Sequence, residues 1–406
     1  MLRGPSHGFA SVRYVAFLRL GTTRRIVVLA VGALVAIIAL AAVASAAIGG
    51  GGSAPPPRPL ANALHDALTA PPVSGVTARV DFSTNLFAGA TTETSSALLK
   101  GGGGRLWAAK DKLRIELQSD NGDAQIVVAN GKGFVYDGPS NTAYTFAFAG
   151  RKKADAHSGK DGAIPALSQI VKKVAQARTH ASISQPTPGV AAGQPAYTVR
   201  AEPRDRGGLL GAAELAWDAA RGVPLRIALY PRGSSTPAVQ LSVTEINYGS
   251  VDDSVFALTP PSGAKVVDLT GSGATTSSDR AAHEGSGTQT LGKLPFTLND
   301  PASLAGRARR EEKPAGHDGA VVLYGKGLDT VAVIEHPADH SGAAAPKPAN
   351  KDGQAVDLPS VSINGAKATA IGTPLGGFVS FDRGGISFTV VGSQPLTVLE
   401  AAARGL

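Results

Sequence analysis

Apolar and polar residues alternate in several short segments of the first two thirds of the chain. The clearest are residues 76–82, 113–117, 225–229 and 239–243. A period of two is typical of strands that bury one face. After residue 243 the apolar positions change parity, which indicates an extra residue in the strand. We therefore expect several antiparallel strands and a bulge that bends one of them.

Two segments in this region have helical spacing instead. Residues 60–68 carry leucines four positions apart. Residues 163–178 place Ile164, Leu167 and Ile170 on one face, and basic residues follow towards the far end, where cations favour the helix dipole. The sequence predicts two helices, each with an apolar face to bury against the strands.

The last third of the chain, residues 293–406, repeats the strand pattern. It predicts a smaller antiparallel sheet with a closing helix over residues 395–404, which begins with a proline as helices tolerate. The expected strands are centred on residues 321–324, 331–334, 368–371, 378–381 and 386–391.

One uncharged segment, residues 26–48, is long enough to cross a bilayer as a helix. Arg24 and Arg25 precede it, so the positive-inside rule places residues 1–25 in the cytoplasm as a basic tail. The alternative is a cleaved signal peptide, because residues 44–46 have the small side chains that signal peptidase accepts. We expect an uncleaved anchor, a single pass through the cell membrane, and extracytoplasmic C-terminal domains.

Two low-complexity segments divide the exported part. Residues 49–59 are rich in Gly and Pro and predict a linker. Residues 270–292 lack aromatic residues and apolar periodicity, which predicts a second linker. The expected domains are therefore residues 60–269 and 293–406.

The formal charge of +8 does not point to nucleic acid. Five arginines and no acidic residue lie in residues 1–48, so the other 34 basic residues face 31 acidic ones. The positive charge belongs mainly to the tail. The chain has no cysteine, which excludes disulfides, thiolate metal sites and cysteine nucleophiles.

The signatures of common enzyme classes are missing from the sequence, and we expect neither catalysis nor a cofactor or metal. Residues 287–293 have phosphate-loop spacing, but Leu294 stands where Ser or Thr should bind magnesium. Residues 335–340 offer two histidines, although Pro337 argues against a helix, so we expect a solvated loop. The two adjacent aspartates, Asp252 and Asp253, predict a turn.

Aromatic residues in period two are the most distinctive feature of the first domain. Phe134 and Tyr136, then Tyr144, Phe146 and Phe148, together with Trp107, would line one face of the sheet. The alternative is an ordinary packed core. The candidate lining of an apolar ligand cavity consists of Trp107, Leu113, Ile115, Leu117, Phe134, Tyr136, Tyr144, Phe146, Phe148, Ile164, Leu167, Ile170, Leu225, Ile227, Val239, Leu241 and Val243.

Several segments also resemble a known family. They are residues 105–107, 112–116, 131–138, 217–218, 222–226 and 253–264 in the first domain, and 323–333 and 386–392, followed by the closing helix, in the second. They are similar to the outer-membrane lipoprotein carrier (LolA-like) fold, and more specifically to two-domain MucB/RseB-type regulators of envelope stress and sigma factors. The resemblance implies an α+β protein, with an unclosed antiparallel β-barrel covered by helices that holds acyl chains.

These observations lead to two functional hypotheses. The first is a membrane-anchored binding protein that holds a lipid or lipoprotein acyl chain for envelope sensing or local hand-off. The second is a regulatory module that binds a transmembrane anti-sigma factor. A tethered chain cannot shuttle far, which favours local action over free transport.

Overall fold

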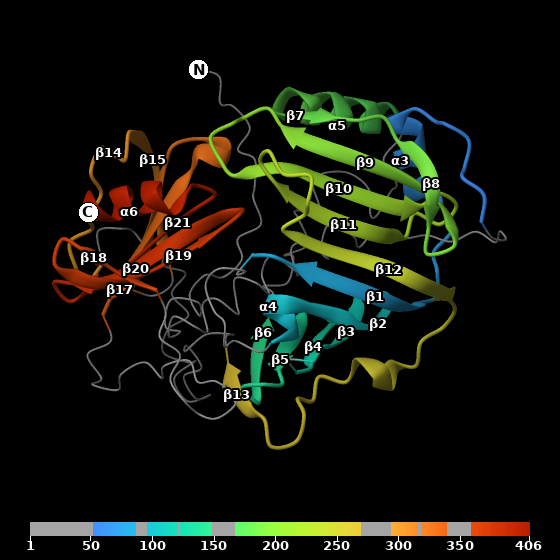
Figure 1. Cartoon of the computed structure of the whole chain (residues 1–406), viewed down its shortest axis with the longest axis horizontal. Coiled ribbons are helices and arrows are strands. Elements are labelled where there is room, and N and C mark those ends of the chain that lie inside the picture. Colours follow the sequence, from blue (N-terminus) through green and yellow to red (C-terminus); the bar gives the residue numbers. More distant parts are fainter. Residues whose placement is uncertain are drawn as a thin grey trace, which may run out of the picture.

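The computed structural model describes residues 52–86, 96–120, 122–147, 167–268, 294–315, 318–338 and 359–406. Its strands form two sheets that share no strand (Figure 1). The larger has thirteen strands and the smaller has eight.

The large sheet is open and curled, as expected (Figure 1). Its strand order is β13-β6-β5-β4-β3-β2-β1-β12-β11-β10-β9-β7, and β8 also pairs with β9. Every pair is antiparallel except β13 with β6, which is parallel. The strands are β1 (Val76–Thr84), β2 (Gly101–Ala109), β3 (Lys112–Gln118), β4 (Ala124–Ala129), β5 (Lys132–Asp137), β6 (Thr142–Ala147), β7 (Ala181–Ile183), β8 (Thr187–Ala191), β9 (Gln194–Pro203), β10 (Leu210–Asp218), β11 (Pro224–Pro231), β12 (Val239–Tyr248) and β13 (Lys265–Asp268).

Strands β1 and β12 join the two halves of this sheet. Arg79 lies opposite Glu245 and Val80 lies opposite Val243, so Thr244 is an extra residue in β12. The bulge predicted after Val243 is therefore confirmed. An extra residue on one strand bends it and increases the local twist.

Three helices accompany the large sheet: α3 (Leu60–Thr69), α4 (Ala97–Lys100) and α5 (Leu167–His180). Helix α3 matches the prediction for residues 60–68. It buries Ala63 and Ala67 against Tyr197 of β9 and Trp217 of β10. The Tyr197 hydroxyl also donates to the Pro56 carbonyl at 2.6 Å, which fixes the end of the linker beside the helix.

Helix α5 differs from its prediction in what it covers. It packs against α3 and β7 at one end of the sheet (Figure 1). Ile170 is buried, but Leu167 and Val171 are exposed. The predicted first turn, residues 163–166, lies outside the described residues. The apolar face of α5 is thus only partly buried.

A 3₁₀ turn, η1 (Asp253–Phe256), follows β12. The Asp252 side chain accepts a hydrogen bond from the Ser254 backbone N–H at 2.8 Å. The turn predicted at 252–253 is therefore confirmed, with Asp252 as its cap.

The small sheet has the order β14-β15-β16-β17-β21-β20-β19-β18, and each pair in it is antiparallel. The strands are β14 (Ser303–Leu304), β15 (Arg307–Ala315), β16 (Gly319–Tyr324), β17 (Val331–Pro337), β18 (Ser360–Ile363), β19 (Ala366–Thr373), β20 (Gly376–Arg383) and β21 (Ile386–Gly392), with a 3₁₀ turn η3 (Gly327–Asp329) and helix α6 (Leu396–Arg404). Helix α6 lies across β19, β20 and β21 and confirms the predicted closing helix.

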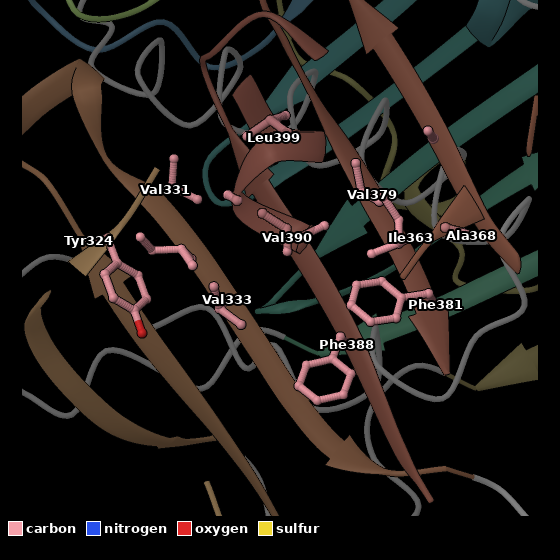
Figure 2. Packing of buried hydrophobic residues seen from close by; sticks show 14 of the residues in the cluster. Tyr324, Val331, Val333, Ile363, Ala368, Val379, Phe381, Phe388, Val390 and Leu399 are labelled. Atoms are coloured by element: carbon pink, nitrogen blue, oxygen red, sulfur yellow. The ribbon is translucent and has the colours of Figure 1, made fainter. Parts of the chain in front are cut away.

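Figure 2 shows the core of the small sheet. Val333, Val390 and Val379 from three neighbouring strands point to the face on which Leu399 of α6 lies. The rings of Phe381 and Phe388 stack with centroids 5.0 Å apart. The small sheet therefore has a core of its own, independent of the large one.

The prediction of a solvated loop at 335–340 is wrong for its first residues. Glu335 and His336 lie in β17, opposite Phe388 and Ser387 of β21, and both side chains are buried. The alternating strand continues to Pro337 because proline still fits at a strand end. Asp339 and His340 lie outside the described residues, and the described part of the chain holds no group of three metal-ligating side chains.

Other predictions fall on residues that the structure does not describe: the cytoplasmic tail 1–25, the membrane segment 26–48, and the second linker 270–292 with its phosphate-loop spacing. No helix within the described ranges has the length and apolar character needed to span a membrane.

Candidate functional site

One face of the large sheet carries a continuous apolar cluster, which we call the inner face. Its buried strand residues are Val80, Phe82, Ile115, Leu117, Ala124, Ile126, Val135, Tyr144, Val239 and Leu241. Partly buried residues extend it: Leu106, Leu113, Val128, Phe146, Ile227, Leu229, Val243 and Val267.

The strand register places these residues in rows. One row crosses six strands and contains Leu106, Ile115, Ile126, Val135, Tyr144 and Val267, each directly opposite the next. Directly opposite side chains in a sheet contact each other, so the row is one apolar strip. The strip runs at right angles to the strands and is the longest uninterrupted feature of the inner face.

Two glycines leave a gap in the inner face. Gly102 and Gly104 of β2 share the parity of Leu106, and they lie opposite Phe82 and Val80 of β1. Glycine contributes no side chain, so a second layer can approach the sheet closely there. A Cβ atom at Gly102 or Gly104 would instead meet the backbone of β3, at the Gln118 and Glu116 carbonyl oxygens. Helix α4 packs on β1, β2 and β3 and buries Leu98 in the cluster.

Helix α4 is short, and Ala97, Leu98 and Leu99 are buried. It has four residues, and its cap is the Ser96 hydroxyl, which accepts a hydrogen bond from the Leu98 N–H at 3.3 Å. An isolated helix of one turn has little stability of its own. Its place on the inner face therefore depends on the apolar contacts of residues 97–99.

Another described group that packs on the inner face comes from the small sheet. Leu375, in the turn between β19 and β20, packs against the inner-face cluster while remaining half-buried. Helix α3 covers a separate part, over Val199 and Leu215. Among the described residues outside the strands, α4, Leu86 and Leu375 therefore pack against the inner-face cluster.

The structure places nine of the predicted lining residues on the inner face, where they belong to or pack against its cluster. The nine are Leu113, Ile115, Leu117, Tyr144, Phe146, Ile227, Val239, Leu241 and Val243. Leu225 is buried at a register irregularity of β11, opposite the bond between Ala216 and Trp217, and is not part of the cluster.

The prediction that the aromatic residues share one face is wrong. Val135 lies opposite Tyr144, whereas Phe134 lies opposite Thr145. Phe134 and Tyr136 therefore point to the outer face, and so does Trp107, which lies opposite Arg114. Neighbouring residues of a strand point to opposite sides, so these aromatics cannot join Tyr144.

The outer face has its own cover, which explains why Phe134 is buried there. Arg114 of β3 donates to the Val255 carbonyl of η1 at 3.1 Å, and η1 packs against β3 and β4. The remaining candidates are not placed on the strip by any described contact. Leu167 and Ile170 lie on α5, and Phe148 and Ile164 are outside the described residues.

A buried ionic group fixes the strands that flank the inner face. Asp218, at the end of β10, is fully buried and accepts the Tyr248 hydroxyl at 2.6 Å and an Arg221 guanidinium N–H at 3.1 Å. Burial raises the pKa of Tyr248, and the hydrogen bond to Asp218 raises it further. The Tyr248 hydroxyl therefore stays protonated at neutral pH, and its hydrogen bond joins β12 to β10.

Sequence reasoning missed four residues of the strip: Leu106, Ile126, Val135 and Val267. The signal was present at Asn130-Gly131, a pair typical of two-residue hairpins. Both residues have positive φ, 52° and 76°, and Ala129 pairs with Lys132. Counting outwards from that turn places Ile126 opposite Val135. Leu375 had no comparable signal because its contact depends on how the two sheets meet.

Neither protein-family models nor curated proteins give a match to this sequence. Among solved structures, the chain is similar to MucB in the MucA/MucB complex of Pseudomonas aeruginosa, with 18% identity, 85% of this chain and 94% of that chain covered, and a TM-score of 0.36. It is also similar to a putative outer membrane lipoprotein-sorting protein domain from Vibrio parahaemolyticus, with 10% identity, 45% and 89% coverage, and a TM-score of 0.15. At such scores, any functional argument has to come from the residues of this chain.

Proposed function

We propose that this chain is a membrane-anchored extracytoplasmic binding protein whose inner face holds an apolar chain, such as the acyl chain of a lipid or lipoprotein. The observation that carries the proposal is the six-residue apolar strip of the inner face, against whose cluster helix α4 and Leu375 pack. The proposed role is sensing or local hand-off near the membrane.

An acyl chain suits this surface for a physical reason. A linear hydrocarbon laid along the strip removes apolar area from water on both partners, which stabilises the complex by about 25 cal/mol per Å². The strip offers branched and aromatic side chains from six strands and requires no reaction chemistry. Binding is therefore the activity that these residues support best.

Two adjacent residues of β2 provide a matched test. Leu106 lies on the inner face and Trp107 on the outer face, and both are half-buried. The full chain in nanodiscs is titrated with a fluorescent 16-carbon fatty acid, with empty nanodiscs as background. We expect Leu106→Gln to weaken binding by about tenfold, equivalent to about 1.4 kcal/mol, and Trp107→Gln to change it less than about twofold.

Two results would count against this proposal. Equal effects of the two variants would place the ligand elsewhere, and absence of uptake by the wild-type chain would remove the lipid hypothesis. In that case a regulatory contact with an anti-sigma-factor-like membrane protein becomes the leading hypothesis. Crosslinking in cells tests it, because a stoichiometric partner should survive the Leu106→Gln change.

A further inference from the structure

Leu375 lies at the tip of a stiff hairpin of the small sheet. Thr373 pairs with Gly376, so Pro374 and Leu375 form a two-residue loop. The Thr373 hydroxyl accepts from the Leu375 N–H at 3.2 Å and donates to the Gly376 carbonyl at 2.9 Å. Proline and these two hydrogen bonds restrict the loop. The hairpin therefore presents the leucine side chain in a fixed direction.

The same hairpin is bonded to the junction of the two sheets. The Ser393 hydroxyl donates to the Leu375 carbonyl at 2.9 Å, and the Ser393 carbonyl accepts from the Leu209 N–H of the large-sheet unit at 2.6 Å. One residue thus contacts both the hairpin tip and the loop between β9 and β10. Ser393 therefore connects the junction to the backbone of Leu375.

A second set of contacts completes the junction. Asp205, in the loop before β10, accepts the Gly207 N–H at 2.8 Å and the Leu328 N–H of η3 at 2.9 Å. These hydrogen bonds lower the pKa of Asp205, with the Gly207 bond contributing most. The carboxylate therefore stays ionised at neutral pH and holds the two units together.

At two positions of the junction, the backbones of the two units are too close to leave room for a side chain. A Cβ atom at Gly208 would lie 2.8 Å from the Ser393 hydroxyl oxygen and 2.9 Å from the Leu328 carbonyl oxygen. A Cβ atom at Gly207 would lie 2.9 Å from the Asp329 Cα atom. The glycines allow the backbones to approach, and any larger residue there would separate the units.

We propose that Leu375 is an internal competitor for the inner face, so that an acyl chain binds by displacing it and loosening the junction at Leu209 and Ser393. This inference rests on the proposed function, because it concerns the regulation of that same surface. Linkage makes the effect reciprocal: a ligand that separates the units binds more tightly to a chain whose junction is already weakened. Ligand occupancy is thereby converted into a change in how the two units are arranged.

Two variants test the competition by the same fatty-acid titration of the full chain. Leu375→Ala removes the competing side chain, and Gly208→Val forces the junction apart. We expect each to tighten binding by about three- to tenfold, the effect of freeing part of a leucine-sized apolar surface. The controls are Leu258→Ala, an exposed leucine, and Gly189→Val, where a Cβ atom would have no neighbour within 4 Å.

A separate experiment measures how the large-sheet and small-sheet units are arranged. The chain has no cysteine, so spin labels can be placed at Ser182 and Lys367, both exposed and on different sheets. Pulsed electron paramagnetic resonance should show that fatty acid broadens or shifts the distance distribution of the wild-type chain. Leu375→Ala should show a broadened distribution without ligand.

The outcomes separate the two proposals. Wild-type binding that is unchanged or weakened by Leu375→Ala would overturn the competition and leave the proposed function intact. An unchanged distance distribution in a ligand-saturated wild-type chain would also overturn it. Binding by neither wild type nor Leu375→Ala would overturn both.

Discussion

Leu106 and Trp107 are neighbours in the sequence, yet they serve different faces of the large sheet. The same holds for Phe134 and Val135, where the smaller residue belongs to the strip and the larger one to the outer face. Residue size therefore does not identify the inner face. The position of a residue relative to the nearest turn identifies its face, because the turn sets the strand register and side chains then alternate along each strand.

Ile126 provides a test of core packing at this scale. It is fully buried in the middle of the strip, between Ile115 and Val135. We expect Ile126→Ala to lower the free energy of unfolding by about 2–4 kcal/mol, through lost apolar burial and the cavity left behind. Chemical denaturation measures this loss in the free energy of unfolding. Val190→Ala, at an exposed position, should cost less than about 0.5 kcal/mol, and equal losses would contradict this account.

Glu335 is an unusual residue in the small sheet. It is fully buried, its Oε2 accepts the Asn299 N–H at 2.9 Å, and its Oε1 has no partner among the described residues. Burial raises the pKa of Glu335 to about 7, because the charged form loses its hydration. Burial, followed by the charge of Glu335, also raises the pKa of Tyr324 to about 12. The folded state thus favours the neutral carboxyl group.

This raised pKa predicts a pH dependence of stability. The folded pKa lies above the unfolded value, so the folded chain binds more protons between about pH 4.5 and 7. Stability should fall across that window as pH rises, by up to about 3 kcal/mol. Glu335→Gln keeps an acceptor for Asn299 and should flatten the profile in urea denaturation from pH 5 to 8. A profile unchanged by the substitution would contradict the assignment.

Short turns decide the geometry of the elements. Asn130-Gly131 joins β4 to β5 with positive φ at both residues, which matches the twist of the flanking strands. This turn sets the register that aligns Ile126 with Val135. A single turn thereby determines which face of two strands becomes apolar.

Gly131→Ala tests the turn. The φ of 76° at this position is unfavourable for alanine, so we expect a loss of about 1–2 kcal/mol in unfolding free energy. Gly103→Ala is the matched control, because a Cβ atom there meets nothing within 4 Å and φ is not positive. It should be neutral or slightly stabilising in thermal denaturation. Similar losses in both variants would show that the turn conformation is not the cause.

Periodicity predicted most of the elements. The strands around 76–82 and 321–324, helices α3 and α6, and the bulge after Val243 follow from local spacing alone. The shared aromatic face was a wrong inference because it treated hairpins as separate strands and ignored their register. The contacts of α5 depend on packing against α3 and β7, and those of Leu375 depend on packing between the two sheets. Local pattern encodes neither.

At the scale of the whole molecule, charge is concentrated near the N-terminus. Residues 1–48 hold five arginines and no acidic residue, and residues 26–48 are uncharged. The proposed anchor would keep the inner face near lipid, whereas cleavage after Ala46 would release it. Whether the anchor is retained therefore decides whether the binding protein acts at the membrane.

Membrane retention is tested on the full chain expressed in cells. We expect the protein to stay in the membrane fraction after alkaline carbonate extraction, because 23 uncharged residues suffice to span a bilayer. Its N-terminus should lie before residue 26. N-terminal sequencing gives the second readout. A chain that lacks residues 1–48 serves as the control and should be extracted. A mature N-terminus at Ala47 would contradict retention.

The pairing of β1 with β12 has a consequence for synthesis and for truncation. Strands β2 to β11 all come between these two in the sequence. While the chain is being made, β1 keeps one unpaired edge until β12 has emerged, and such edges favour aggregation. Contacts so distant in sequence also slow folding. The first six strands therefore cannot be cut out as a free-standing miniature, since removing β12 would leave the middle of the sheet as an open edge.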